Sequence, residues 1–143
     1  MTPEDVKVLI AFRMKQAYEC LDDARTLMAL EKGFRTIVNR SYYAAFYSVL
    51  ALLQIKGKIP RKHRGVIVLF DVEFIKAGLL PKNLSDALHW LFDSRNKEDY
   101  VSMRSVSRAE AEQAIKTSES FVQSIHAYLH KESYLRINEN KEC

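Results

Sequence analysis

The chain has 143 residues, of which 48% are hydrophobic and 28% are charged, and its formal net charge is +4. These values are typical of one compact globular domain, and they exclude a disordered chain. The small positive charge permits contact with phosphate-bearing partners, but it is too small to indicate a dedicated nucleic-acid binder.

The chain contains only four glycines and three prolines, which favours a few long helices. Two cysteines, Cys20 and Cys143, do not form a disulfide framework or a zinc site, and Cys20 is expected to be a buried small hydrophobe. The polar N-terminus is unlike a secretory signal, and the most apolar stretch, residues 42–55, is shorter than the about 20 residues of a membrane span. We therefore expect a cytoplasmic protein with no membrane partner.

The first predicted helix has a clear start. Thr2 can cap it, Pro3 suits the first helical position, and Asp5 stands where a capping box places its acid. Gly33 is expected to end the helix in the usual C-terminal role. Apolar residues recur in steps of three and four along one face, at Val6, Ile10, Met14, Ala17, Leu21, Ala24, Leu27 and Met28.

The second predicted helix covers residues 34–56 and ends at Gly57. Its middle, residues 42–53, is apolar nearly all round, so it must be covered on several sides. In a domain of this size we expect part of that cover to come from a second subunit, which predicts a homodimer.

Three further helices follow. A shorter one is expected over residues 61–77, between Pro60 and Gly78, and the next begins after an Asn83 cap. The last begins at Ser107, with Glu110 three residues on as in a capping box. The predicted fold is an all-α, antiparallel, up-and-down bundle of four or five helices over residues 1–132, with a polar tail over residues 133–143. The apolar faces of the last two helices carry Leu84, Leu88, Leu91 and Phe92, and Ala111, Ala114, Ile115, Ser118, Phe121, Val122, Ile125 and Leu129.

Several signatures of catalysis and metal binding are absent. The chain has no glycine-rich phosphate loop and no Cys/His spacing for a metal. His126 and His130 are four residues apart, but with no third ligand in view they are expected to be solvated surface histidines. No metal or other cofactor is predicted.

Arg40 precedes an aromatic cluster early in the second helix, at Tyr42, Tyr43, Phe46 and Tyr47. The aromatic side chains are expected to fill the bundle. For Arg40 two interpretations stay open: an ion pair with an acid on a neighbouring helix, or contact with a phosphate.

Arg95 follows Leu88 and Leu91 by seven and four residues, so it projects from the apolar face of its helix. An arginine in this place must be paired, because burial of an isolated charge is costly. Asp99 is one partner in reach, which would make an internal ion pair. The alternative is a phosphate at a subunit seam, since the guanidinium fork matches phosphate oxygens.

Residues 56–64 form a basic patch that includes Lys56, Lys58, Arg61, Lys62 and Arg64. Such a patch is most often a solvated loop and helix start. If Arg95 holds a phosphate, the patch would add sequence-independent attraction for RNA or a nucleotide.

Together these features resemble the HEPN family, and most closely a small prokaryotic branch whose motif reads Arg, a few residues, then Asp-Tyr. The resemblance lies in the Arg-x-Tyr-Tyr-Ala-x-Phe run at residues 40–46, in Gly57 and His63, in the Gly-Leu-Leu turn at residues 78–80, and in residues 95–100. It implies an antiparallel helical bundle, a homodimer, and pairing with a minimal nucleotidyltransferase in toxin–antitoxin or defence modules.

Active members of that family are metal-independent endoribonucleases with an arginine followed four to six residues later by a histidine. Here Tyr100 stands in the place of the histidine, and a tyrosine with its pKa near 10 is a poor base at neutral pH. The resemblance carries a catalytic role onto Arg95 and Tyr100. It carries nucleotide or phosphate binding onto Arg40, Arg95, Asn96 and Asp99.

Three hypotheses follow. The first is the nucleotide- or RNA-binding half of a HEPN–nucleotidyltransferase pair. The second is a metal-independent ribonuclease toxin that acts through a dimeric cleft around Arg95, with Tyr100, Asp99 or His89 in place of the missing histidine. His89 lies about 120° from Arg95 around the helix, so these two would meet only across a dimer seam. The third is purely structural oligomerisation, with Arg95 in a buried ion pair.

Overall fold

The computed structural model describes the backbone of residues 1–100 and 105–135 and the side chains of residues 1–96 and 105–135. Over these residues the protein is all-α, as the sequence predicts. No described helix is long and apolar enough to cross a bilayer. The elements are α1 (Pro3–Ala29), α2 (Phe34–Lys56), α3 (His63–Phe70), the π-helical turn η1 (Asp71–Ile75), α4 (Lys82–Tyr100) and α5 (Arg108–Lys131).

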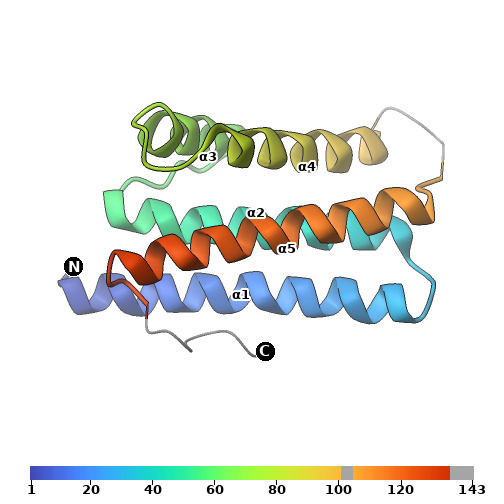
Figure 1. The fold of residues 1–143 in the computed structure, drawn as a ribbon, viewed down its shortest axis with the longest axis horizontal. Helices are drawn as coiled ribbons and strands as arrows, with labels where there is room; N and C mark the ends of the chain where they lie inside the picture. The colour runs from blue at the N-terminus through green and yellow to red at the C-terminus, as the bar shows by residue number, and fades with distance from the viewer. Residues whose placement is uncertain (101–104, 136–143) are drawn as a thin grey trace.

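The helix α2 is the centre of the bundle. It contacts α1, α3, α4 and α5. In Figure 1, α1 forms one outer layer, α2 and α5 run side by side in the middle, and α3 and α4 form the other outer layer. The all-round hydrophobicity of α2 is therefore satisfied inside one chain, where Val49, Ala51 and Leu53 are fully buried. The homodimer stays a prediction, but this property of α2 no longer argues for it.

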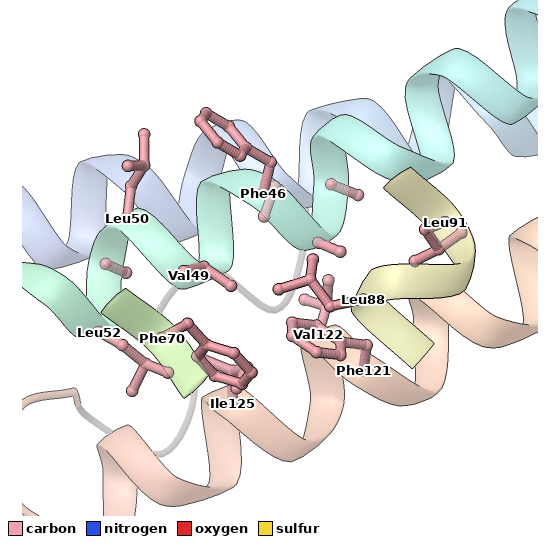
Figure 2. Close-up of a cluster of buried hydrophobic side chains, with 14 of the residues drawn as sticks. Phe46, Val49, Leu50, Leu52, Phe70, Leu88, Leu91, Phe121, Val122 and Ile125 are labelled. Carbon is pink, nitrogen blue, oxygen red and sulfur yellow. The ribbon is translucent and has the colours of Figure 1, made fainter. Parts of the chain in front are cut away.

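In the largest core cluster, buried side chains of α3 and α4 pack against those of the other helices. Phe70 of α3, Leu88 of α4 and Phe121 of α5 turn toward one another beside α2 (Figure 2). All three are at most 1% exposed, and the Phe70 and Phe121 rings lie 5.8 Å apart. Since α3 and α4 carry most of the residues discussed below, this packing determines where their side chains lie.

Two helix starts agree with the sequence. Thr2 caps α1 with a full capping box, because its hydroxyl accepts from the Asp5 N–H and the Asp5 carboxylate accepts from the Thr2 N–H. Ser107 caps α5 by accepting from the Glu110 N–H at 3.1 Å. Gly57 ends α2 in a left-handed conformation, as expected.

The prediction that Gly33 ends the first helix is wrong. The last residue of α1 is Ala29, and Glu31 takes the left-handed position with a φ of 57°. The Glu31 N–H donates to the Met28 carbonyl and the Lys32 N–H to the Leu27 carbonyl, which together make a Schellman motif. Gly33, with a φ of 68°, instead caps the start of α2.

The helix expected over residues 61–77 is shorter and irregular. It starts at His63, and after Phe70 it widens into the π-helical turn η1, where the Lys76 N–H donates to the Asp71 carbonyl five residues back. The Asn83 cap is also wrong, because α4 begins at Lys82. The Leu84 N–H donates to the Pro81 carbonyl, so the chain enters this helix directly from Pro81.

The two histidines of α5 lie in different surroundings. His130 is exposed, as expected, but the expectation of a surface position is wrong for His126, which is 6% exposed. The hydroxyl of Tyr18 on α1 lies 2.9 Å from His126 Nδ1, so a long-range polar contact supports its burial. In the described part of the chain, no three His, Cys, Asp or Glu side chains gather as metal ligands would.

The cap at Ser107 gives a stability prediction. Ser107→Ala removes the acceptor of the Glu110 N–H, and we expect the free energy of unfolding to fall by about 1 kcal/mol. Urea denaturation measures this change. Ser120→Ala, at an exposed position inside the same helix, is the matched control and should change stability by less than about 0.5 kcal/mol. Equal effects of the two changes would show that the cap contributes nothing.

Candidate functional site

Arg95 lies on α4 against the aromatic residues of α2. Its side chain is half-buried, and its guanidinium carbon is 5.9 Å from the centre of the Tyr42 ring and 5.6 Å from that of Tyr43. Leu88 and Leu91 on the same helix are fully buried, so Arg95 does project from the apolar face. Its Nη1 donates to Asn96 Oδ1 at 3.2 Å, which brings two of the predicted site residues together.

Arg40 reaches the same tyrosine from within α2. Its guanidinium carbon is 5.0 Å from the centre of the Tyr43 ring. Its Nε and Nη2 donate to Asn39 Oδ1 at 3.1 and 2.7 Å, and its Nη1 to Cys20 Sγ at 3.6 Å. Among the described residues an amide and a thiol hold Arg40, and no carboxylate pairs with it. Cys20 itself is buried, as predicted.

The other side of Arg40 faces a pocket of about 420 Å³ between α1 and α2. Its lining includes three carboxylates, those of Glu19, Asp22 and Asp23. An anion is repelled on this acidic side and attracted on the side of Tyr43, where Arg95 also lies. The acidic lining therefore argues against this pocket as a site for a phosphate.

His63 is the residue that sequence reasoning missed. It is the first residue of α3, its Nδ1 lies 3.1 Å from the Tyr42 hydroxyl oxygen, and its ring stacks on Phe46 with centroids 4.3 Å apart. The ring is also 5.6 Å from that of Tyr43, the same ring that Arg95 approaches. The resemblance included His63 but gave it no role.

A signal for His63 was present in the pattern of α3. Val66, Ile67 and Phe70, which lie three, four and seven residues further on, are buried. That spacing places His63 on the inward face of the helix, although it stands in a run of basic residues. A histidine on an apolar face at the edge of a core calls for a partner, and Tyr42 is that partner.

The protonation of the Tyr42–His63 pair follows from its surroundings. Burial is the main cause that raises the pKa of Tyr42, so its hydroxyl keeps its proton. Burial, and then the charge of Arg95, hold the pKa of His63 below its usual value, so the imidazole is neutral at neutral pH. Both groups are satisfied when the Tyr42 O–H donates to Nδ1, which leaves the imidazole proton on Nε2.

A third guanidinium lies at the edge of the site. Arg64 is exposed, and its guanidinium carbon is 5.9 Å from the centre of the Phe92 ring, which in turn is 5.7 Å from that of Tyr42. We call Tyr42, Tyr43, Phe46 and Phe92 the aromatic cluster. Arg40, Arg64, Arg95 and His63 all contact it, so the site gathers cations and a neutral imidazole around rings that limit access of water.

Three other candidate residues, Asp99, Tyr100 and His89, are not seen to contact this site. Asp99 and Tyr100 belong to α4, but their side chains lie outside the described residues, and so does the possible ion pair between Arg95 and Asp99. His89 is exposed, and its Nε2 lies 2.7 Å from Asp71 Oδ2 at the start of η1. Among the described residues its polar contact is with Asp71, so this chain does not bring His89 to Arg95.

Some residues of the basic patch make contacts on the surface, and others belong to the site. Lys58 pairs with Glu73 at 3.9 Å, and the Lys56 amine lies 5.5 Å from the centre of the Phe74 ring. Only His63 and Arg64 of residues 56–64 contact the aromatic cluster. The rest of the patch is mostly solvent-exposed, which fits long-range attraction of an anion better than direct recognition.

Comparison with known proteins shows the family of this chain. The HEPN domain model matches residues 10–128, which include α2, α3, α4 and every residue of the site. A UPF0332 protein of Thermotoga maritima is 37% identical over 117 residues, covering 82% of this chain and 88% of the relative. A candidate toxin of Methanocaldococcus jannaschii is 34% identical over 122 residues, covering 85% and 90%. A UPF0332 protein of Gloeobacter violaceus is 33% identical over 130 residues, covering 90% and 98%. The chain therefore belongs to the HEPN family.

Proposed function

We propose that this HEPN protein binds a phosphate group of RNA or of a nucleotide at Arg95. It does so as the toxin-like half of a toxin–antitoxin or defence pair whose other half is a minimal nucleotidyltransferase. The observation that carries the proposal is that two half-buried guanidiniums, those of Arg95 and Arg40, lie 5.6 and 5.0 Å from the ring centre of Tyr43.

The chemistry of the arginines favours a phosphate ligand. A guanidinium presents N–H donors in a planar fork that matches two phosphate oxygens. The Asn39 side chain accepts two hydrogen bonds from the Arg40 guanidinium and Asn96 accepts one from that of Arg95, so an amide helps to orient each fork. The tyrosine rings beside them lower the local dielectric constant, which strengthens the attraction of an anion.

The likeness to a candidate toxin supports the biological setting. A homodimer is part of the proposal, and exposed apolar residues beside the site support it. Val68 and Val72 of the α3–η1 segment are 54% and 46% exposed and lie one and two turns beyond Arg64. Apolar side chains exposed at this spacing are typical of a surface that meets another protein. Asp99, as a partner of Arg95, and Tyr100, near the catalytic position, remain parts of the proposal that rest on the resemblance.

Cleavage of the bound RNA is the competing outcome. It needs a base near the ribose 2′-hydroxyl, and Tyr100 is a poor one. Among the described residues, His63 is the imidazole that contacts the same rings as Arg95. When the Tyr42 O–H donates to its Nδ1, the imidazole proton is on Nε2. In that tautomer its Nε2, the nitrogen left open to a ligand, donates a hydrogen bond and cannot act as the base toward the 2′-hydroxyl, which favours binding over cleavage.

Fluorescence anisotropy with a labelled single-stranded RNA of about twelve nucleotides tests the proposal. We expect saturable binding that weakens as salt rises, because contacts to phosphates release counterions. The same mixture, kept with EDTA and resolved on a denaturing gel, should contain intact RNA. Fragments with 2′,3′-cyclic phosphate ends would instead establish the ribonuclease. No binding of this RNA or of ATP at low salt would refute the proposal.

A further inference from the structure

We propose that His63 is a second phosphate-binding residue of this site: its Nε2–H donates to the phosphate that Arg95 binds, and the imidazole takes up a proton as that phosphate binds. This inference rests on the proposed function of Arg95. It concerns a residue on a different helix from the motif on α4, and it gives phosphate binding a dependence on pH.

Placement is the first argument. His63 of α3 and Arg95 of α4 contact the same two rings of α2: Tyr42, at 5.9 Å from each, and Tyr43, at 5.6 Å from each. The charge of Arg95 also acts on the imidazole strongly enough to contribute to its lowered pKa. Both side chains therefore approach the same pair of rings, which is the placement that two donors to one phosphate require.

Orientation is the second argument. The imidazole is clamped by stacking on Phe46 and by the Tyr42 hydroxyl at Nδ1, so its ring plane is determined by two contacts from α2. Within the described part of the chain, Nδ1 makes the one hydrogen bond of this ring, so the Nε2–H is available to a ligand. The side chain is half-buried, which leaves an edge that a ligand can reach.

Charge is the third argument. Among the described side chains, the titratable and charged groups around His63 are Tyr42 and Tyr43 from α2, Arg95 from α4 and the neighbouring Arg64 on α3. Of these side chains, imidazole is the type that ordinarily changes its charge near neutral pH, so His63 is the group that can respond to a bound anion there. Without ligand, burial and Arg95 disfavour the charged imidazole. A bound phosphate offsets Arg95 and favours proton uptake at Nδ1, whose N–H then donates to the Tyr42 hydroxyl oxygen.

The sign of the pH effect follows from this linkage. Because the bound state holds a protonated imidazole more readily than the free state, binding tightens as the pH falls through the pKa of His63. A shift of one pKa unit between the two states corresponds to about a tenfold change in the dissociation constant. A mere structural role for His63 would give no proton uptake on binding.

Isothermal titration with hexauridylate tests the inference. This RNA, with hydroxyl groups at both ends, carries only phosphodiesters, which do not titrate between pH 5.5 and 8. Titrations in two buffers of different ionisation enthalpy report the protons taken up. We expect the wild type to take up a fraction of a proton and to bind up to about tenfold more tightly at pH 5.5 than at pH 8.

His63→Gln keeps an N–H donor but cannot be protonated, so it should abolish both the proton uptake and the pH dependence. His89→Gln is the matched control, since His89 is exposed and pairs with Asp71, and it should keep both. Tyr42→Phe leaves the imidazole in place and removes its orienting hydroxyl, so it should weaken binding at pH 8. It also provides a test if His63→Gln fails to fold.

The possible failures are distinct. If the wild type does not bind hexauridylate at any pH, the proposed function at Arg95 fails and His63 with it. If the wild type binds without proton uptake, or if His63→Gln keeps that uptake, the role of His63 is refuted while phosphate binding at Arg95 stands. If His89→Gln lost the proton uptake, the proton would bind at His89 and not at His63, and the inference would equally be overturned.

Discussion

Arg95→Ala is expected to weaken RNA binding by about 10- to 100-fold and to leave the melting temperature within about 3 °C of the wild type. The loss follows from removal of charge-assisted hydrogen bonds to a phosphate, and the small thermal effect follows from a half-buried position at the edge of the core. Anisotropy with labelled RNA and circular dichroism measure the two quantities.

Conservative and control variants sharpen this test. Arg95→Lys should restore binding only in part, because an ammonium cannot reproduce the guanidinium fork. Arg108→Ala removes a cation that pairs with Glu31 and Glu112, so it should leave RNA binding nearly unchanged. A sharp fall in melting temperature for Arg95→Ala that a second change, Asp99→Ala, restores would instead show a buried ion pair.

Leu91→Ala is expected to lower the free energy of unfolding by about 2–5 kcal/mol. Leu91 is fully buried on the inward face of α4, where it belongs to the main core cluster. Its truncation removes apolar burial and leaves a cavity that the surrounding helices fill only in part. Urea denaturation monitored by circular dichroism gives the change in stability.

Leu30→Ala provides the matched control for that measurement. Leu30, at the end of α1, is 61% exposed, and the same truncation there should cost less than about 0.5 kcal/mol. If Leu91→Ala were as mild as Leu30→Ala, the inward face of α4 would be assigned wrongly. Arg95, one turn further along α4, would then not face the aromatic residues of α2 either.

The regular parts of the fold could be predicted because their signals are local. The caps at Thr2 and Ser107 and the glycine at Gly57 lie at helix ends, and each acts through residues at most four positions away. Apolar residues at steps of three and four likewise identify the buried face of α1, α4 and α5. These interactions depend little on the rest of the chain, so the sequence contains them.

The deviations depend on tertiary packing. Glu31 takes the left-handed position at the end of α1, although glycine is favoured there, and Gly33 two residues later begins the next helix. The π-helical turn after Phe70 changes the hydrogen-bond register without any glycine or proline at that point. His126 is buried with a partner 108 residues away in the sequence, which no periodicity indicates.

Part of the candidate site could likewise be predicted from local sequence signals, and part of it depends on tertiary packing. The aromatic run of α2 and the inward position of Arg95 could be predicted from spacing, and the neighbouring Asn96 follows from sequence alone. The contact of both Arg95 and His63 with the rings of Tyr42 and Tyr43 could not be predicted, because it depends on how α3 and α4 pack on α2. The arginine motif that the resemblance emphasises lies on α4, whereas the imidazole of this site comes from α3.

A crystal structure of the protein with bound hexauridylate tests the central claim most directly. We expect a phosphodiester within hydrogen-bond distance, about 2.7–3.2 Å, of the Arg95 guanidinium, with His63 Nε2 on another oxygen of the same phosphate. The uridines should run past the exposed edge of the aromatic cluster toward Arg64. RNA bound on a surface that does not include Arg95, or an Arg95 guanidinium engaged by a carboxylate in the presence of RNA, would contradict it.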